Sequence, residues 1–584
     1  MDDKSLEILE FPAVKKIIAG FASFPAGYEL TLELTPSSDF EDVARLLRQA
    51  GEAMQLLSVD AVPSIGGASD IREEVGRAAL GKVVEPLSLV EIQQTLAVLR
   101  QVRDSLENKE SEAPELWLIA KNITGFPGVE KEIGRCLSPG GEVLDRASPK
   151  LASIRKRLIS SRQDLHQRLD EIIRTPKWQK IIQEPIITER EGRYVIPVRT
   201  EFRRDMEGIT HDISNTGATV FVEPLAAIDL GNTIRELAIE ERHEVERILE
   251  ELSGKVGSYN AEISAGVSCL AELDVIIAKA RYAREVKAAE PNLIKLDGGS
   301  GKAVFGPFIR LVEARHPLLG KKAVPLSLEI GRDFSVLVIT GPNTGGKTVA
   351  LKTIGLHSLM TQAGIPVPAA PETCLPVFDG IFADIGDEQS IEQTLSSFSW
   401  HMNNAVRIID NTTGQSLVLL DELGTSTDPA EGSALARSIL LHFLSQKTLT
   451  VATTHYADLK AFAHNTPGIQ NASFDFDPDT LTPTYHMTLG IPGGSNALAT
   501  AGRLGIPSEI IDRARTMLSK GALDLDAALA DIMAEKQKIS GARELLEKER
   551  ESVNAQNAEI ESRLAKLRAE ERRTTDEARD SIIR

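Results

Sequence analysis

A glycine-rich segment between an apolar run and a helix-like run is the clearest chemical signal in this chain of 584 residues. It follows the apolar residues 336–339 and precedes the helix-like residues 349–360, so we expect a strand, a turn and a helix in that order. Its fixed positions match G-x-x-x-x-G-K-[ST], the spacing of a P-loop. Backbone N–H groups of such a turn face a phosphate, and the helix N-terminus adds partial positive charge. The predicted phosphate-binding turn consists of Gly341, Pro342, Asn343, Thr344, Gly345, Gly346, Lys347 and Thr348.

Side chains of this turn and one acidic pair would complete a nucleotide site. Lys347 would reach the β- and γ-phosphates, and the Thr348 hydroxyl would ligate Mg²⁺. Asp421 and Glu422 follow the apolar run 416–420, which is typical of a buried parallel strand. We expect Asp421 to hold the metal through water and Glu422 to polarise the attacking water. The pattern therefore predicts ATP and Mg²⁺ as cofactors of a hydrolase.

A histidine follows the third expected strand of this region. Residues 448–453 form a strand-like run, and His455 comes shortly after it. Ligands of open α/β sheets bind at the carboxyl ends of the strands, so we expect His455 to sense the γ-phosphate. The alternative is a hydrogen-bonded core histidine, the commoner role of a lone histidine, which this position favours less.

Three segments together resemble the ATPase domain of the MutS family, which is part of the wider ABC ATPase group. They are GPNTGGKT at 341–348, LVLLDELGTSTDPAEG at 417–432 and ATTHY at 452–456. Residues 314–318 resemble the opening of that nucleotide-binding domain, and 396–402 resemble its signature loop.

The resemblance implies a homodimer with two composite ATP sites. Ser396 stands where the family has a serine that contacts the partner subunit's nucleotide, although an ordinary helix-capping serine is the alternative. The segment 424–427 resembles the family's subunit-interface loop.

Further segments are similar to one branch of that family, called MutS-two. They lie at 192–199, 208–212, 217–224 and 384–391. Two features depart from the family pattern. We find no mismatch-reading domain, which puts mismatch recognition in doubt. The Smr nuclease domain that the branch usually carries is also not found, so no residue here is assigned nuclease activity.

Bulk composition narrows the function classes. No apolar run is long enough to span a bilayer, no signal peptide is seen, and three cysteines form no C-x-x-C pair, so we expect a cytoplasmic protein without a membrane partner. A net charge of −19 argues against indiscriminate coating of nucleic acid, but it leaves room for a local basic groove. Aromatic residues are only 4%, too few to favour a base-stacking platform.

The pattern along the chain predicts an α/β ABC-type ATPase domain joined to a mostly helical core and lever, with a small β-rich insert. Charged amphipathic helices are expected at about 146–183 and 226–290, with breaks allowed at the glycines of the second. They flank the insert. We expect a helical core at 1–145, lever helices at 146–300 with the clamp insert at 186–224, the ATPase domain with dimerisation helices at 301–515, and a charged long helix at 516–584 that leads to a missing domain.

Two surfaces keep alternative interpretations. Arginines of the insert would contact nucleic-acid phosphates, or they would belong to a solvated β surface in which nearby carboxylates balance their charge. The tail repeats an apolar residue every seven positions from Leu525, but its second seam position is mixed, so a weak coiled coil and a free solvated helix fit equally. Gly494 stands where the branch would have a basic residue near the nucleotide.

The favoured hypothesis is a dimeric ATPase that opens and closes a clamp on a large nucleic-acid assembly. The resemblance implies two cargoes: collided ribosomes, which would be split into subunits, or branched DNA, whose binding would suppress recombination. We lean slightly to the ribosome. Mismatch repair is disfavoured by the missing mismatch reader. An SMC-like tether is disfavoured because its P-loop and Asp-Glu strand would be hundreds of residues apart. A scaffold without turnover is disfavoured by Glu422.

Overall fold

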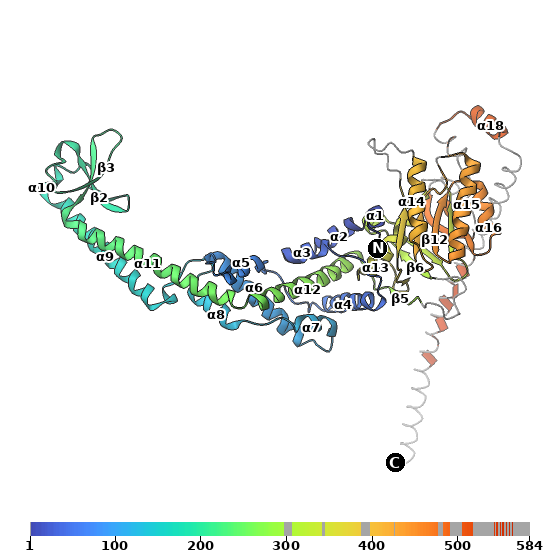
Figure 1. Cartoon of the computed structure of the whole chain (residues 1–584), viewed down its shortest axis with the longest axis horizontal. Helices are drawn as coiled ribbons and strands as arrows, with labels where there is room; N and C mark the ends of the chain where they lie inside the picture. Colours follow the sequence, from blue (N-terminus) through green and yellow to red (C-terminus); the bar gives the residue numbers. More distant parts are fainter. Residues whose placement is uncertain are drawn as a thin grey trace, which may run out of the picture.

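The protein is elongated, with a small sheet at one end and a larger sheet-and-helix body at the other (Figure 1). The computed structural model describes residues 2–296, 307–341, 345–386, 397–425, 427–476, 483–490, 501 and 505–517, with short pieces between 542 and 564. Helices and strands are mixed, as an α/β fold requires. The boundaries of the four expected domains stay a prediction.

Short helices build the first part of the chain. Many start at a proline, whose fixed φ suits the first helical turn, and α4 is capped by the Asp39 side chain, which accepts from the Asp42 N–H at 2.8 Å. The apolar faces of α3 to α8 pack into one core with α12, whereas α2 packs in the core of the large sheet. The helices are α1 (Asp3–Ile8), α2 (Phe11–Ala19), α3 (Pro25–Leu32), α4 (Phe40–Ser58), α5 (Arg72–Ala79), α6 (Pro86–Glu107), α7 (Pro114–Ala120) and α8 (Pro127–Cys136), followed by the short η1 (Asp145–Ala147).

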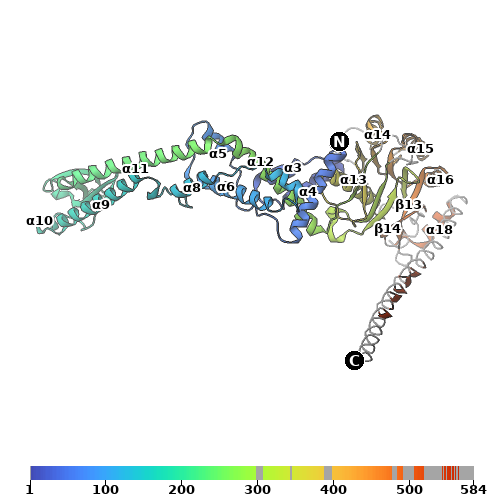
Figure 2. The same cartoon turned by 90° about the horizontal axis from the view of Figure 1, so that it is seen from below.

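Three long helices form the lever. The helices α9 (Pro149–Arg174) and α11 (Leu225–Gly257) lie side by side and carry the small sheet, whereas α12 (Asn260–Val286) continues towards the large sheet (Figures 1 and 2). The first predicted helix was too long, because Pro176 starts a separate short helix, α10 (Pro176–Gln179). The second is broken after Gly257, whose Cα lies so close to α5 that a Cβ would stand 2.6 Å from the Ala78 carbonyl.

A four-stranded antiparallel sheet forms the tip of the lever, where the sequence predicts strands. Its order is β1-β2-β4-β3, and α10 and the ends of α9 and α11 pack on it through one small apolar core. We call this sheet the clamp sheet. Its strands are β1 (Thr188–Arg190), β2 (Arg193–Arg199), β3 (Gly208–Ile213) and β4 (Thr219–Pro224), with η2 (Thr200–Phe202) after β2.

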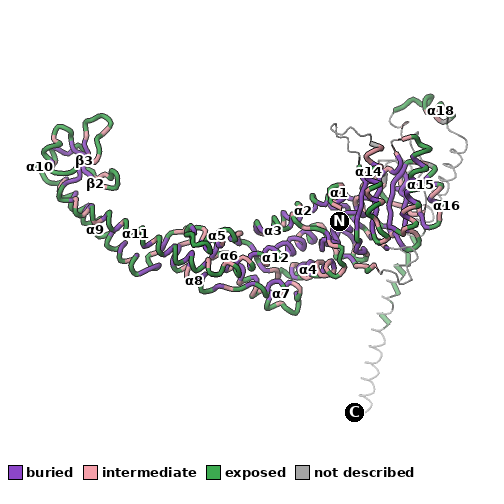
Figure 3. Tube along the Cα trace, in the orientation of Figure 1, coloured by how far each residue is buried: buried purple, intermediate pink, exposed green. Residues whose placement is uncertain are grey.

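A six-stranded sheet dominates the other end. Its order is β10-β11-β12-β8-β13-β14, and all neighbours except β13 and β14 are parallel. Buried residues run along these strands (Figure 3), as expected for near-continuous apolar runs covered on both faces. The strands are β8 (Val336–Thr340), β10 (Ile381–Asp384), β11 (Leu417–Leu420), β12 (Leu449–Thr454), β13 (Ile469–Phe476) and β14 (Pro483–Leu489).

The helices of this end are α13 (Lys347–Gln362), α14 (Ser397–Asn411), α15 (Pro429–Gln446), α16 (Ala457–Asn465) and α18 (Ser508–Met517). A second sheet of order β5-β9-β6-β7 borders the body, formed by β5 (Asn292–Ile294), β6 (Ile309–Ala314), β7 (Leu326–Ile330) and β9 (Cys374–Pro376), with η3 (Pro317–Lys322) between β6 and β7.

The N-terminal helix belongs to this same end of the molecule. In α1, the Ser5 hydroxyl accepts from the Ala383 N–H of β10 at 2.9 Å, and the Lys4 ammonium donates to Asn404 of α14 at 2.7 Å. Lys4 also lies 4.7 Å from the centre of the Trp400 ring. The chain therefore starts on the large sheet, leaves it to build the lever, and returns to it (Figures 1 and 2).

Candidate functional site

The glycine-rich turn lies at the carboxyl edge of the large sheet. The strand β8 ends at Thr340, and α13 begins at Lys347, which gives the strand, turn and helix order that the sequence predicts. Gly346 has φ of 94°, a left-handed conformation, and a Cβ there would stand 3.1 Å from the Tyr485 ring of β14. The left-handed backbone therefore favours glycine at this position, and the close Tyr485 ring leaves little room for a side chain.

Lys347 points back across the turn. Its ammonium donates to the Gly341 carbonyl at 2.6 Å and lies 2.9 Å from Nε2 of His455. The side chain is almost fully buried, and that burial lowers the pKa of Lys347 to about 8, although the nearby carboxylates of Glu422 and Asp421 act in the opposite direction. Among the described residues, the partners of this buried ammonium are a carbonyl and an imidazole, which leaves it well suited to bind phosphate oxygens.

Asp421 and Thr348 meet across two elements. The Thr348 hydroxyl, in the first turn of α13, donates to Oδ2 of Asp421 at 2.7 Å, just after the end of β11. These are hard oxygen ligands, the type that Mg²⁺ prefers, and they lie beside the predicted phosphate-binding turn. Among the described residues there is no group of three or more His, Cys, Asp or Glu side chains that could hold a metal alone. The donor set thus fits a metal that also takes ligands from a nucleotide and water.

Glu422 turns away from Asp421. Its φ of 49° is left-handed, which is uncommon for a residue with a side chain, and its carboxylate lies 3.5 Å from Nε2 of His455. His455 has its pKa lowered by partial burial and by the positive charge of Lys347. The structure therefore brings together the predicted residues Lys347, Thr348, Asp421, Glu422 and His455.

One residue of this site was missed by the sequence analysis. Thr453, fully buried on β12, donates from its hydroxyl to Oδ1 of Asp421, and the oxygen of the Thr453 hydroxyl accepts the Glu422 N–H at 2.8 Å. The signal that could have found it is a threonine on a strand that pairs with the strand before Asp421. The pairing itself, in which Leu420 faces Ala452, is not readable from either segment alone.

A cavity of about 270 Å³ opens beside the turn. It is bounded by η3, by the exposed side of α13 and by β14, and it includes His316, Val349 and Tyr485. Burial lowers the pKa of His316, so this histidine is neutral at physiological pH. An apolar cavity next to the predicted phosphate-binding turn has a suitable place and lining for a nucleobase.

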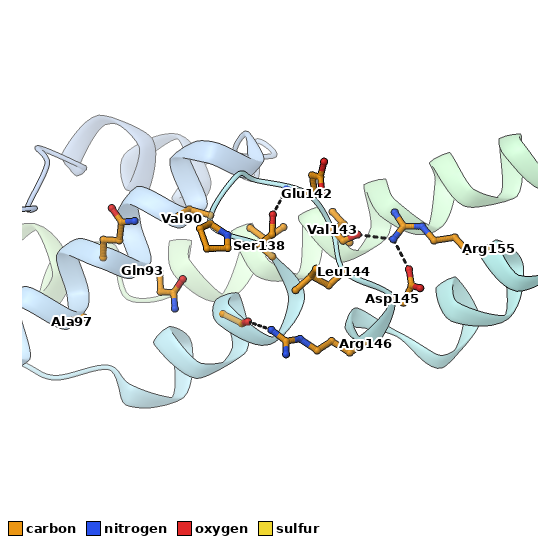
Figure 4. A pocket seen from close by; sticks show the side chains of 14 residues that line it. Val90, Gln93, Ala97, Ser138, Glu142, Val143, Leu144, Asp145, Arg146 and Arg155 are labelled. Atoms are coloured by element: carbon orange, nitrogen blue, oxygen red, sulfur yellow. Dashed lines mark hydrogen bonds and ion pairs between the residues drawn. The ribbon is translucent and has the colours of Figure 1, made fainter. Parts of the chain in front are cut away.

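A second concavity lies far from this site, at the joint of the lever. It has a volume of about 1010 Å³ and is bordered by α6, α8 and the start of α9 (Figure 4). Its arginines are committed to neighbours: Arg155 donates to the Val143 carbonyl at 2.7 Å and to Asp145 at 2.6 Å, and Arg146 donates to the Gly134 carbonyl at 3.0 Å. Its polar groups therefore serve the joint.

Several predicted positions lie outside the described residues. These are Pro342, Asn343, Thr344, Ser396, Ser426, most of the segment 384–391, the loop around Gly494 and most of the heptad tail. None of the described helices is long and apolar enough to cross a membrane.

The fold and the site define a class of protein. Residues 337–521, which contain the parallel sheet and the predicted site, match the family model of MutS domain V. The chain is 42% identical over 571 residues to endonuclease MutS2 of Pelotomaculum thermopropionicum, a match that covers 97% of this chain and 72% of the relative. It is 44% identical over 538 residues to endonuclease MutS2 of Thermomicrobium roseum, covering 91% and 68%. It is 41% identical over 553 residues to the putative endonuclease MutS2 of Bacillus subtilis, covering 94% and 69%. The chain belongs to the MutS2 family, which confirms the predicted branch.

Proposed function

We propose that this chain is a Mg²⁺-dependent ATPase that acts as a homodimer and moves a clamp on a large nucleic-acid assembly. The observation that carries the ATPase proposal is the meeting of three elements at one sheet edge. Lys347 and Thr348 come from α13, Asp421 and Glu422 follow β11, and His455 follows β12. Membership of the MutS family, whose proteins are ATPases, supports the same conclusion.

Each side chain has a role that follows from its position. Lys347 would exchange its bonds to Gly341 and His455 for the β- and γ-phosphates. Mg²⁺, when bound, would neutralise charge on the phosphates, and Thr348 and Asp421 would hold it, the latter through water. Glu422 would accept a proton from the attacking water, and His455 would hydrogen bond near the γ-phosphate. The assignments of Pro342, Asn343 and Thr344 to the phosphate cradle and of Ser396 to the partner's nucleotide stay predictions.

The nucleic-acid proposal rests on the clamp sheet and on the family. Relatives are named endonuclease MutS2, and MutS family proteins bind DNA and act as dimers. The helices α11 and α12 separate the clamp sheet from the proposed ATP site, and this length is suited to binding a large nucleic-acid assembly. We favour collided ribosomes, split into subunits in the cytoplasm. For either cargo, the lack of a recognisable mismatch-reading segment in the sequence favours recognition of shape over readout of bases. Binding of branched DNA with suppression of recombination is the alternative.

The ATPase assignment is tested with two variants. Glu422→Gln should bind ATP as the wild type does and lose turnover by about a hundredfold or more, because the water-polarising carboxylate is gone. Lys347→Ala should lose tight ATP binding measured by calorimetry. Wild-type turnover in the first variant, or wild-type affinity in the second, would remove the respective residue from the proposed site.

The cargo is tested with the same stalled enzyme. We would express Glu422→Gln in cells, crosslink it, recover it and sequence the attached nucleic acid. Ribosomal RNA with sedimentation alongside paired ribosomes would support the ribosome, and chromosomal DNA from recombination or replication sites would support the DNA role. Recovery of neither, with ATP binding intact, would contradict the clamp proposal for this chain.

A further inference from the structure

A lysine of the lever is buried at the far end of the P-loop helix. Lys279, on α12, is fully buried, and its ammonium donates to the Ala363 carbonyl at 2.8 Å. Ala363 is the C-cap residue of α13, the helix whose first residues are Lys347 and Thr348. The two ends of one helix of 16 residues thus contact the predicted nucleotide site and the lever.

No described carboxylate lies close enough to Lys279 to balance its charge by an ion pair. Within the described parts of the chain, Lys279 forms no ion pair; Asp42 and Glu272 act on it only at a distance, and Arg45 opposes them. Burial lowers its pKa to about 8, so the group is still mostly an ammonium at neutral pH. The cost of burying this charge is offset by the negative end of the α13 dipole and by the Ala363 carbonyl, which as a C-cap carbonyl has no partner within the helix.

Other contacts hold the same end of α13. Gln362, fully buried, donates to the carbonyls of Ser37 at 2.7 Å and Phe378 at 2.9 Å, and it accepts the Phe378 N–H at 3.1 Å. Gly364 adopts φ of 65° and lies so close to α4 that a Cβ would stand 2.4 Å from Cβ of Leu46. This end of α13 is therefore fixed to the helical core and to α12 together.

The helix α12 belongs to two cores at once. Ile276, Ile277 and Ala280 pack in the core of the short helices, whereas Ala278 and Tyr282 pack in the core of the large sheet. Lys279 lies between these two sets. Beyond the break at Gly257, α11 carries the clamp sheet, so α12 is the element that connects the sheet body to the lever.

We propose that Lys279 is a positioning residue that ties the P-loop helix to the lever, so that the nucleotide state at Lys347 and Thr348 is transmitted to the clamp through α12. This inference rests on the proposed ATPase function. A shift of α13 along its axis would leave a buried ammonium without its acceptor, which is strongly unfavourable. The helices α12 and α13 are therefore expected to move together, with the bending confined to the break between α11 and α12.

The identity of the residue supports a role in coupling over a role in stability. A methionine would fill the same volume without the cost of burying a charge, and apolar replacement of buried charges is often neutral or stabilising. Lys279→Met should therefore fold, with a melting temperature equal to or above that of the parent. If Lys279 served only to stabilise the fold, Lys279→Met would instead lower the melting temperature.

The test compares Lys279→Met and Tyr282→Phe in a Glu422→Gln background, which keeps ATP from being consumed. Tyr282 is the matched control: it is fully buried on the same helix, and its hydroxyl has no hydrogen-bond partner among the described residues. ATP affinity is measured by calorimetry, and hydrogen–deuterium exchange is compared with and without ATP. The parent and Tyr282→Phe should show ATP-dependent changes in α13, α12 and α11. Lys279→Met should bind ATP within about twofold of the parent, which is Glu422→Gln alone. Its ATP-dependent changes in exchange should be confined to α13 and should not reach α12 or α11.

Several outcomes would overturn the inference. One is the same exchange response in Lys279→Met as in the parent, and another is a parent that binds ATP without any response beyond α13. Failure of both Lys279→Met and Lys279→Gln to fold would also count against it, because the lysine would then be structural. A parent that binds no ATP would instead refute the proposed function, which keeps the two failures apart.

Discussion

At the scale of single residues, the Thr453 hydroxyl contacts both acidic residues of the site, Asp421 and Glu422, whose side chains point in different directions. Thr453 donates to Asp421 and accepts the Glu422 N–H, while Thr348 donates to the other oxygen of Asp421. The left-handed backbone of Glu422 makes adjacent side chains diverge, so Asp421 faces α13 and Glu422 faces His455. The hydrogen bond from the Glu422 N–H to the Thr453 hydroxyl helps to offset the strain of this left-handed conformation.

Removing this hydroxyl should slow turnover and weaken use of Mg²⁺. In Thr453→Val the shape is kept, Asp421 loses one donor, and the Glu422 N–H loses its acceptor, so we expect kcat to fall by about 10- to 100-fold with a raised Mg²⁺ requirement. ATP binding should change little, because Lys347 is untouched. Thr453→Ser should restore most activity. Thr450→Val is the control: it is buried on the same strand, and its hydroxyl donates to the Thr448 carbonyl at 3.2 Å, its one side-chain hydrogen bond within the described residues. Equal losses in Thr450→Val and Thr453→Val would contradict the assignment.

Lys347 should give ATP binding a dependence on pH. Its pKa in the folded protein is lowered to about 8, so the ammonium predominates below pH 8 and is lost as the pH rises above it. Because phosphate binding requires the charged form, affinity should fall by about twofold between pH 7 and 8 and then by up to about tenfold per pH unit. Calorimetry at several pH values measures this. A wild-type affinity that is constant up to pH 10 would show that the proton is not linked to binding.

At the scale of elements, the sequence predicted what depends on local pattern. The strand, turn and helix around Lys347 were predictable because glycine spacing and apolar runs are local signals. Thr453 and Lys279 were not, since their roles arise from strands and helices that are distant in sequence. Lys279 did leave a signal, as a lone charge within the apolar stretch 275–278 and Ala280. The length of α9 was misjudged because its charged pattern continues up to Pro176, where the backbone cannot follow.

A buried carboxylate joins the two helices that carry the clamp sheet. Glu244 of α11 accepts from the Ser148 hydroxyl at 2.8 Å, from Arg247 at 2.7 Å and from Lys150 at 3.2 Å, and Ser148 is also the N-cap of α9. The hydrogen bonds from Arg247 are the main reason that the pKa of Glu244 is lowered to about 2. The joint between α9 and α11 therefore depends on the ionised form.

Glu244→Gln should loosen this joint without changing ATP turnover. The variant keeps the shape but loses the charge-assisted bonds, and we expect it to lower unfolding stability by about 1 to 2 kcal/mol at pH 7. A carboxylate with a lowered pKa stabilises the fold above its unfolded pKa and loses that effect as the pH falls, so the difference from wild type should vanish between about pH 4.5 and pH 2. Urea midpoints by circular dichroism measure both effects. Glu240→Gln, exposed on the same helix, should change little, and equal effects in the two variants would refute the role of Glu244.

At the scale of the whole molecule, the clamp sheet and the proposed nucleotide site lie at opposite ends (Figure 1). Not all arginines of the clamp sheet are available there. Arg193 is held by Glu223 at 3.2 Å and by Asn232 at 2.8 Å, and Arg190 lies 3.3 Å from Asp212 and stacks on Phe221. These two arginines therefore serve the sheet itself, which supports the solvated-surface interpretation for part of the set.

Three arginines remain as candidates for phosphate contact. Arg199, Arg203 and Arg204 are exposed around η2, and within the described residues their side chains form no ion pair. Each phosphate contact on duplex DNA adds about 0.9 to the dependence of log affinity on log salt concentration. Replacing all three by serine should weaken binding similarly for all sequences and reduce that slope by about 1 to 3. Fluorescence anisotropy on branched DNA and on ribosomal RNA fragments, at several salt concentrations, measures both quantities.

The control for this variant carries the same change of charge elsewhere on the lever. Lys156, Arg157 and Arg162 are exposed on α9, away from the clamp sheet, and their replacement by serine should leave the slope nearly unchanged. If both triple variants lower the slope equally, the long-range charge of the lever is responsible and not contact at η2. If neither does, the clamp sheet does not bind phosphates, and contact with cargo must come from another part of the dimer. A loss confined to Arg199, Arg203 and Arg204 would place the cargo at the tip, where movement of α11 has its largest effect.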